Sequence, residues 1–435
     1  MDLEKGLQVF VGNLNPNCPQ PEHSMGMPPH SDHGLLSLLT QNGIGSFQLQ
    51  HNGIWINVNA MPYSFLVNIS NQLESSMAAI PQPSQPSPTQ ISKMTYIKKV
   101  AESPGLTSVP SSYAFTLSPN DQAVSEGPED SIPIIDFSLL TSGTPDQRSQ
   151  LIQELGQACK DWGFFKLINH GVPESLIEAT IEGIRGFFNL TDEEKREFEG
   201  KNLLDPIRCG TSFNTSTEQV FYWRDYLKVV VHPEFHFPDK PAGFSELSLE
   251  YCKRTRGVAR ELLKAISESL GLEPFYIEKV MNLDKSFQMF AANFYPPCPQ
   301  PELAMGLPPH SDHGLLSLVT HNGIGGFQLQ HNGMWVNVNA IPNSFLVNIA
   351  DQLEILSNGK YKSILHRAVV NKKVTRISLV MTNGPSLDKI VNPAPELVNN
   401  GIDQPAYHGI TYKEYFQCQQ SNSLDGKGNL DRIRI

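Results

Sequence analysis

Three residues in the second half of the chain have the types and spacing of a metal site. His310 and Asp312 stand two positions apart, and His366 follows later in the sequence. Residues two apart in a β-strand point to the same face, so one strand would supply an imidazole and a carboxylate together. A second imidazole from a distant strand completes the two-histidine, one-carboxylate set that binds Fe(II) and leaves coordination positions open. We therefore predict a non-haem iron site at these three residues.

A second pair with the same spacing begins ten residues after His366. Arg376 and Ser378 would share one face of a strand and present a guanidinium and a hydroxyl side by side. A carboxylate accepts charge-assisted hydrogen bonds from both groups. The sequence therefore predicts that an acidic cosubstrate binds beside the metal.

Taken in order, these motifs resemble those of the plant soluble dioxygenases that depend on 2-oxoglutarate and Fe(II). That family has His-x-Asp, a later His and Arg-x-Ser, and residues 293–299 match its Asn-x-Tyr-Pro-Pro-Cys run. Residues 132–137 and 162–171 look like its amino-terminal half. The resemblance covers residues 94 to 420, and it is closest to the flavanone 3-hydroxylase-like and disease-resistance-type oxygenases.

The resemblance implies an α+β fold, with a double-stranded β-helix (jelly roll) core flanked by N-terminal helices. Sequence pattern alone predicts only a mixture of helices and strands. The predicted elements are strands at 132–137 and 164–168, helices at 145–162, 173–188 and 249–270, a short helix after 191, and short strands from 287 onward.

The resemblance also implies the reaction and its cofactors. Fe(II) and 2-oxoglutarate would be required, with ascorbate as reductant. Tyr295 and Asn293 would help to orient 2-oxoglutarate, while Arg376 and Ser378 bind its far carboxylate. A small plant specialised metabolite, such as a flavonoid or phenolic, would be hydroxylated, desaturated or O-demethylated by dioxygen, with release of succinate and CO2.

Two other functions remain open on the sequence. One is an ascorbate-dependent oxidase of the same fold, in which the arginine and serine bind a different small acid. The other is a non-catalytic protein, in which the long chain is a fusion product; the intact metal and carboxylate motifs argue against it. Succinate formation distinguishes the three functions.

Several neighbouring residues have a structural alternative to a role in the site. We interpret three histidines as structural or solvent-facing, His313, His321 and His331, and His170 as part of a turn that packs the amino-terminal half. Three aromatic residues are candidates for the substrate pocket: Phe213, Phe294 and Phe327. The run from Trp223 to Asp225 is interpreted as a buried ion pair beside an aromatic ring.

Composition and charge narrow the classes of partner. The chain has 435 residues, 39% of them hydrophobic, and a formal net charge of −11, which disfavours binding to nucleic acid or to an anionic membrane. No long apolar run or signal-peptide core is seen. The six cysteines are scattered without a Cys-x-x-Cys pair, which indicates free thiols in a reducing compartment. We expect a cytoplasmic monomer.

The beginning of the chain repeats part of the predicted catalytic core. Residues 1–74 align without a gap with residues 281–354, and 47 of the 62 positions from 13 to 74 are identical. The copy carries His30 and Asp32 but ends before any counterpart of His366, Arg376 or Ser378. We interpret it as a relic of tandem duplication or of a misjoined gene, without an iron site of its own.

The domain organisation follows from this repeat and from the resemblance. We expect a partial duplicate at 1–74, a Pro/Ser-rich linker and loop-rich lead-in at 75–131, the amino-terminal half of the dioxygenase at 132–270, the jelly-roll core at 271–420 and a tail at 421–435.

The repeat leads to a first prediction about the need for residues 1–93. A chain that begins at Met94 should release succinate in response to substrate as the full-length chain does, because every predicted site residue lies beyond that point. Parallel assays of the two proteins test this prediction. Activity of the full-length chain alone would show that the repeat contributes to the site.

Overall fold

The computed structural model describes residues 96–115, 124–125, 132–215, 218–339, 341–398, 404–421, 424 and 426–435, together with the backbone of four short strands between residues 36 and 69. The chain forms two compact units, Met1–Ile91 and Ser92–Ile435. Each unit is considered by itself. His30 and Asp32 lie outside the described residues, as do residues 75–95 of the predicted linker and lead-in at 75–131.

In the first unit, the four strands pair as their counterparts do in the second. They are β1 (Leu36–Leu39), β2 (Phe47–His51), β3 (Ile54–Val58) and β4 (Leu66–Ile69). Strand β1 pairs with β4 and β2 pairs with β3, both antiparallel. Leu36 lies opposite Ile69, just as Leu316 lies opposite Ile349 in the second unit. The repeated sequence thus has a repeated strand register.

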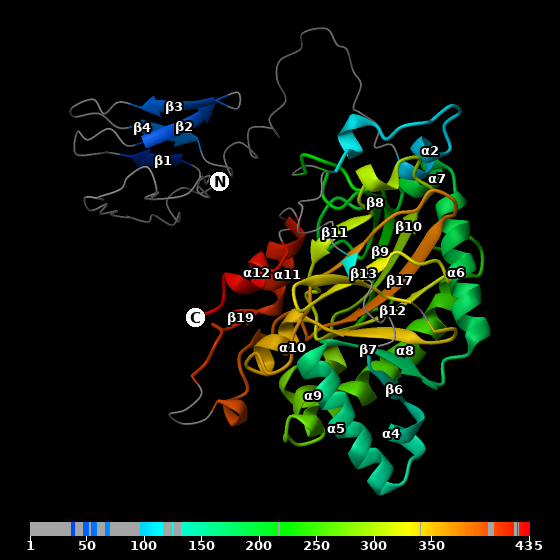
Figure 1. Ribbon diagram of the computed structural model, residues 1–435, viewed down its shortest axis with the longest axis vertical. Helices are drawn as coiled ribbons and strands as arrows, with labels where there is room; N and C mark the ends of the chain where they lie inside the picture. Colours follow the sequence, from blue (N-terminus) through cyan, green and yellow to red (C-terminus); the bar gives the residue numbers. More distant parts are fainter. Residues whose placement is uncertain are drawn as a thin grey trace. The chain divides into compact units, whose positions relative to one another are not determined.

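The second unit contains the other helices and strands of the described chain (Figure 1). Its strands are β5 (Val124–Ser125), β6 (Ile134–Asp136), β7 (Phe164–Ile168), β8 (Ile207–Thr211), β9 (Asp225–His232), β10 (Gln288–Tyr295), β11 (Leu307–His310), β12 (Leu316–His321), β13 (Phe327–His331), β14 (Met334–Asn337), β15 (Phe345–Ile349), β16 (His366–Ala368), β17 (Arg376–Asn383), β18 (Ile390–Val391) and β19 (Ile410–Thr411). Its helices are α2 (Ile97–Ala101), α4 (Ser138–Ser142), α5 (Pro145–Asp161), α6 (Glu174–Asn189), α7 (Asp192–Arg196), α8 (Phe244–Ser269), α9 (Tyr276–Val280), α10 (Asp351–Leu356), α11 (Tyr412–Ser421) and α12 (Gly428–Asp431), with 3-10 turns at Ser111–Tyr113, Leu283–Lys285, Pro301–Leu303 and Pro395–Leu397.

Two sheets form the jelly-roll core that the resemblance implied. The larger has eight strands in the order β6-β7-β15-β12-β17-β10-β9-β8, and the smaller has five in the order β11-β16-β13-β14-β5. Strands from the amino-terminal half, β6 to β9, border the central strands of the larger sheet on both sides. The two predicted halves of the dioxygenase therefore build one sheet together.

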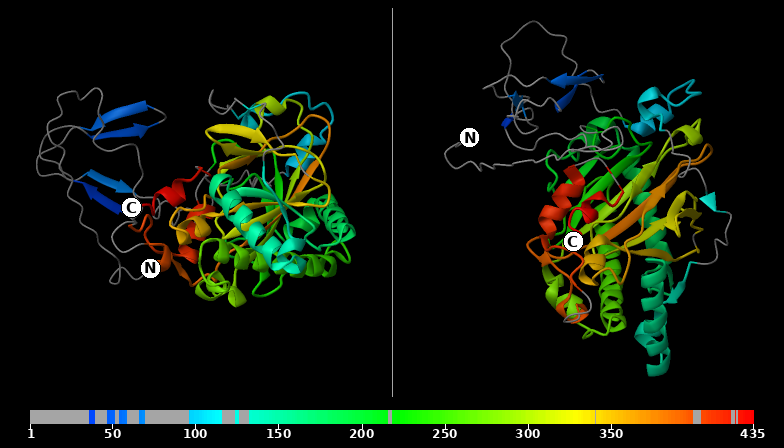
Figure 2. Two further views of the ribbon diagram at one scale, coloured as in Figure 1. Left: turned by 60° about the horizontal axis from the view of Figure 1, so that its bottom comes forward. Right: turned by 60° about the vertical axis from the view of Figure 1, so that its left-hand side comes forward.

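Helices α5, α6 and α8 cover the outer face of the larger sheet (Figure 2). Their apolar stripes pack on strand residues such as Ile377 and Leu379, which are fully buried. Capping boxes at Thr144 and Thr191 start α5 and α7, as the sequence predicted for α7. Helix α8 begins at Phe244, five residues earlier than predicted. Alternate residues of β17 face these helices. The residues between them face the interior between the two sheets.

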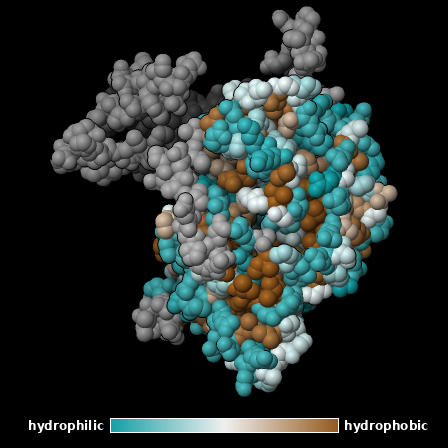
Figure 3. Space-filling view, turned by 45° about the vertical axis from the view of Figure 1, so that its right-hand side comes forward, coloured by the Kyte–Doolittle hydropathy of each residue, from teal (hydrophilic) through white to brown (hydrophobic). Residues whose placement is uncertain are grey.

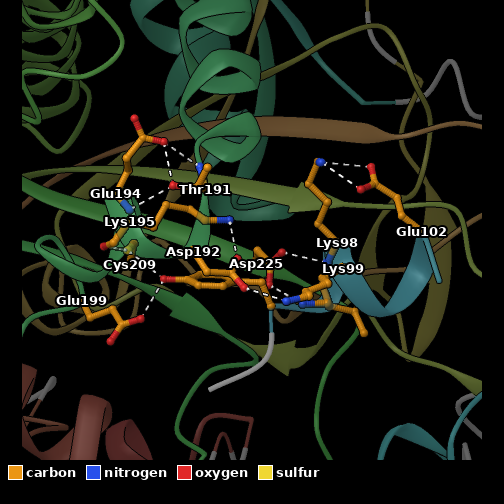
Figure 4. Close-up of polar contacts among 12 residues, drawn as sticks. Lys98, Lys99, Glu102, Thr191, Asp192, Glu194, Lys195, Glu199, Cys209 and Asp225 are labelled. Atoms are coloured by element: carbon orange, nitrogen blue, oxygen red, sulfur yellow. Dashed lines mark hydrogen bonds and ion pairs between the residues drawn. The ribbon is translucent and has the colours of Figure 1, made fainter. Parts of the chain in front are cut away.

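The predicted ion pair between Arg224 and Asp225 is wrong. Neighbouring residues of an extended chain point to opposite sides, so their side chains have different partners. The buried Asp225 carboxylate accepts backbone hydrogen bonds of 2.8 and 2.9 Å from Ile97 and Lys98 at the start of α2 (Figure 4). The Asp225 side chain therefore anchors α2, while Arg224 is directed to the interior between the sheets.

The assignment of Phe294 to the substrate pocket is also wrong. Its side chain is 4% exposed and lies in the core beneath the helices, with its ring 5.1 Å from that of Phe188 on α6. Phe294 stands between Asn293 and Tyr295 on β10, so it must face away from them. The motif residues on either side are the ones that face the interior.

The surface of the described chain is mixed in character. On the face shown in Figure 3, hydrophobic residues gather in patches near the middle with hydrophilic residues around them. Within the described residues, no helix is long and apolar enough to cross a membrane.

Candidate metal centre and cosubstrate site

The structure brings His310, Asp312 and His366 together. One ligand atom from each residue lies within 4.8 Å of the others. His310 and His366 are directly opposite each other where β11 pairs with β16, and their ring centroids are 4.2 Å apart. The Asp312 Oδ1 atom is 3.6 Å from His366 Nε2 and 3.9 Å from His310 Nε2. Two nitrogens and one oxygen in this arrangement could hold one Fe(II) ion and leave other positions open.

Asp312 reaches this position in a different way from the one predicted. Strand β11 ends at His310, so strand alternation does not place Asp312. Instead, the Asp312 carbonyl accepts a 2.9 Å hydrogen bond from the backbone of Asp351, and Asn348 Nδ2 donates to Asp312 Oδ2 at 3.0 Å. Ser311 does point away, as predicted, and donates to the Asp351 carboxylate. Asn348 and Asp351 therefore orient a candidate ligand that lies in a loop.

Backbone carbonyls set the tautomers of both histidines. His310 Nδ1 lies 2.8 Å from the Pro308 carbonyl, and His366 Nδ1 lies 3.1 Å from the Ile364 carbonyl. A carbonyl oxygen can only accept, so each Nδ1 carries the proton and donates it. Each Nε2 is then left with a lone pair directed toward Asp312, which is the state that binds a metal.

Charge interactions inside the site separate the pKa values of the three groups. Burial, assisted by His366, lowers the pKa of His310 to about 3. Burial acts to raise the pKa of Asp312, but the two histidines outweigh it and the pKa falls. For His366 burial acts to lower the pKa, yet the Asp312 charge and hydrogen bond raise it above its ordinary value. His366 is therefore the one residue of the three that competes for a proton near neutral pH.

The residues of the predicted carboxylate clamp also meet in the structure. Across the antiparallel pair β10 and β17, Tyr295 lies opposite Arg376 and Asn293 lies opposite Ser378. The Arg376 guanidinium is 5.2 Å from the centre of the Tyr295 ring, and Asn293 Nδ2 donates to Ser378 Oγ at 3.3 Å. Arg224 Nη1 donates to Asn293 Oδ1 at 3.0 Å. Sequence reasoning missed this contribution of Arg224.

The Arg376 guanidinium is buried without a hydrogen-bond partner in the described part of the chain. Its side chain is 1% exposed, and Nε, Nη1 and Nη2 all lack an acceptor there. Burial lowers the pKa of Arg376, which Tyr295 opposes. A buried cation without a partner is costly, whereas a bound carboxylate would accept from two of these nitrogens at once. The donor set therefore fits an acidic cosubstrate.

Three of the four histidines discussed above have packing or hydrogen-bond partners within the described chain. His313 is buried, with Nδ1 2.7 Å from the Tyr412 hydroxyl. His331 stacks on Trp162 at 3.7 Å, and His170 Nε2 lies 3.1 Å from the Asn343 carbonyl. His321, which lies opposite Ser378, is buried, and burial together with Arg376 lowers its pKa to about 4.

Two of the three aromatic pocket candidates face the interior. The Phe327 ring stacks over His366, with the two ring centroids 5.3 Å apart. The centre of the Phe213 ring lies 4.4 Å from Nζ of Lys228, a residue on the inner face of the larger sheet.

A jelly roll with this triad and clamp defines a class of proteins, the non-haem iron oxygenases that use an acidic cosubstrate. Comparison with known protein families supports this class. The profile of the 2OG-Fe(II) oxygenase superfamily matches residues 286–385 and also residues 6–86, and the profile described as non-haem dioxygenase in morphine synthesis N-terminal matches residues 132–248. The chain belongs to the 2OG-Fe(II) oxygenase superfamily and is an Fe(II)- and 2-oxoglutarate-dependent dioxygenase.

Individual relatives support this assignment. The chain is 47% identical to 2-oxoglutarate-dependent dioxygenase 19 of Oryza sativa subsp. japonica over 71% of its own length and 91% of that protein. It is 39% identical to flavanone 3-dioxygenase 2 of the same organism over 70% of this chain and 87% of the relative. A crystal structure of JOX2 in complex with 2OG, Fe and JA superimposes with a TM-score of 0.71 at 28% identity, covering 79% of this chain and 98% of that one.

The contact between Asn348 and Asp312 leads to a prediction about metal affinity. Asn348→Ala removes the hydrogen bond that orients the Asp312 carboxylate, and loss of such an outer contact weakens metal affinity by about 10- to 100-fold. Calorimetric titration with Mn(II) measures the effect. Asn202→Ala, which removes an exposed hydrogen bond to Asp205, is the control and should leave the affinity unchanged. Equal affinities of the two variants would contradict the role of Asn348.

The raised pKa of His366 leads to a prediction about pH. Metal binding requires a neutral imidazole, so affinity is full above the raised pKa of His366 and is lost as pH falls through it. His310, with a pKa of about 3, and Asp312 stay deprotonated in this window. Mn(II) affinity should therefore fall by roughly tenfold per pH unit below the raised pKa of His366, one proton per metal. A slope of two protons per metal would show that His310 is also protonated.

Proposed function

We propose that His310, Asp312 and His366 bind the Fe(II), and that Arg376, Ser378, Tyr295 and Asn293 bind 2-oxoglutarate. The enzyme would use them to oxidise a small plant specialised metabolite, a flavonoid or a phenolic, by hydroxylation, desaturation or O-demethylation. The similarity to flavanone 3-dioxygenase 2 supports this substrate class.

The observation that carries the proposal is the unpaired guanidinium of Arg376. Three nitrogens without an acceptor in the described chain lie within the same barrel as the triad, beside the Ser378 hydroxyl. Tyr295 links Arg376 to the triad. Its ring packs in the same apolar cluster as Ala368, which stands two residues after His366. A dicarboxylic keto acid would extend from Arg376 toward the metal. It would pair with the guanidinium at one end and bind the metal at the other.

Each residue then has a defined task. When bound, Fe(II) supplies the redox chemistry that activates dioxygen. Arg376 and Ser378 bind the far carboxylate, and Asn293, itself oriented by Arg224, holds the Ser378 hydroxyl in place. Phe327 covers one face of His366 and excludes water on that side. 2-Oxoglutarate would thereby be held in one orientation in a buried site.

We further infer that the first unit, Met1–Ile91, has no iron site of its own, since the repeat lacks counterparts of His366, Arg376 and Ser378. We also infer a cytoplasmic location and a monomeric state. The five described cysteines are free, which supports a reducing compartment.

Succinate release tests the proposed reaction. Full-length protein, purified without oxygen and loaded with Fe(II), is supplied with 2-oxoglutarate, ascorbate, dioxygen and a pooled library of flavonoids and phenolics. We expect succinate to rise in the presence of the pool, and Asp312→Ala to abolish the rise. A product of substrate oxidation without succinate would instead indicate the ascorbate-dependent oxidase.

The buried guanidinium leads to a prediction about 2-oxoglutarate. Arg376→Gln should raise the KM for 2-oxoglutarate by about 30- to 5,000-fold, since losing one partner of a buried charged pair costs about 2–5 kcal/mol. Substrate affinity should change little. Arg148→Gln, which breaks a half-exposed ion pair with Glu268, is the matched control. A KM that is the same in both variants would refute the clamp.

A further inference from the structure

Two more cations lie on the inner face of the larger sheet, away from the clamp. Arg208 on β8 is directly opposite Lys228 on β9, and Lys228 is opposite Ala291 on β10. Ala291 is two residues from Asn293, so all three share the face that bears the clamp. Arg208 and Lys228 therefore point to the interior. They lie at the end of the sheet formed by β8 and β9, with β10 between them and β17, which carries Arg376.

No described residue forms an ion pair with Arg208 or Lys228, although Asp205 and Glu218 act to raise their pKa values. Like charges directly opposite each other in a sheet are destabilising. Lys228 is 7% exposed and donates to a neutral partner, Gln420 Oε1, at 2.8 Å. The partly buried Arg208 side chain makes no hydrogen bond within the described chain. Burial and the nearby arginines lower the pKa of Lys228 well below its ordinary value, and Glu218 opposes them only in part.

The nearest carboxylates are engaged in their own loops. Glu218 accepts hydrogen bonds from Ser212 Oγ and from the backbone of Asn214. Asp205 accepts from the backbone of Lys201 and Asn202. Both carboxylates stabilise turns, and neither is within ion-pair distance of Arg208 or Lys228 in the described chain.

Helix α11 connects Lys228 to the metal centre. Gln420 accepts from Lys228, and Gln420 Nε2 donates to its neighbour Gln419 at 3.3 Å. Gln419 Nε2 in turn donates to the carbonyl of Ser311, which stands between His310 and Asp312. Lys228 therefore lies one short chain of hydrogen bonds from the triad.

Aromatic rings surround the same lysine. The centre of the Phe213 ring is 4.4 Å from Lys228 Nζ, and that of Tyr226 is 5.2 Å away. Such a wall can pack the ring of a planar ligand while the cations bind its charged end. An aromatic acid has both features in one molecule.

We propose that Arg208 and Lys228 bind a carboxylate of the primary substrate, which makes the substrate an aromatic acid and not a neutral flavonoid. This inference rests on the proposed function and narrows its substrate class. Lys228 would exchange its bond to Gln420 for the carboxylate, and Arg208 would bind the same group. Phe213 and Tyr226 would pack the substrate ring beside the metal.

Matched probes test the charge preference. Benzoate, cinnamate and 2-naphthoate are compared with their primary amides, which have the same rings without the charge. Full-length protein is loaded with Mn(II) and saturated with 2-oxoglutarate, so that Arg376 is occupied. Line broadening of the probe signals by Mn(II) in NMR spectra reports both affinity and proximity to the metal. We expect at least one acid to bind near the metal about tenfold more tightly than its amide.

Variants locate the cause of the preference. Lys228→Met and Arg208→Gln should each reduce the acid-to-amide ratio to about two- or threefold, and Lys228→Arg should retain it because the charge is kept. Lys166→Met is the matched control. Lys166 is a 6% exposed cation on β7, which lies near the other end of the same sheet, and its loss should leave the ratio unchanged.

The outcomes separate this inference from the proposed function. Equal binding of acids and amides, no binding of any acid, or an equal effect of Lys166→Met would overturn the assignment of Arg208 and Lys228. Binding of 2-oxoglutarate to the anaerobic Fe(II) protein, and its loss in Arg376→Gln, are measured independently. If 2-oxoglutarate binds and the probes show no charge preference, the substrate class alone is wrong. If 2-oxoglutarate does not bind, the proposed function fails.

Discussion

The antiparallel register of β11 and β16 is the constraint on which the site depends. It places His310 opposite His366, so that the two imidazoles approach each other from neighbouring strands. A slip of one residue would turn one histidine to the other face of the sheet and remove the pair. Asp312 then needs only to be held at the end of β11, which Asn348 and the backbone of Asp351 do.

Positive charge dominates the rest of the barrel interior. Arg376 and Arg224 lie near the centre of the larger sheet, and Arg208 and Lys228 lie at its edge, while Asp312 supplies a negative charge that a metal would take up. Arg376 has no hydrogen-bond partner within the described chain and Lys228 has only the neutral Gln420 side chain, which is costly for buried cations. Their arrangement is understandable if two different anions enter the barrel, the cosubstrate at Arg376 and the substrate at Lys228. The protein is then preorganised for a loaded state.

Short-range patterns predicted the parts of the site that one strand carries. The spacing of Arg376 and Ser378 gave their common face, and the resemblance gave the jelly roll. Partners set by distant pairing were not predictable, because register between β8 and β9 is not visible in one sequence; Arg208 and Lys228 are examples. The supposed pair of Arg224 and Asp225 was wrong since adjacent residues of an extended chain diverge. The domain boundaries and the dispensability of the repeat stay predictions.

The most direct test of the account is a crystal structure of the protein grown without oxygen in the presence of Fe(II) and 2-oxoglutarate. The account predicts one metal ion bound by Nε2 of His310, a carboxylate oxygen of Asp312 and Nε2 of His366. It also predicts that the far carboxylate of 2-oxoglutarate accepts hydrogen bonds from Arg376 and Ser378. A metal bound elsewhere, or an Arg376 guanidinium that remains unpaired in this complex, would contradict it.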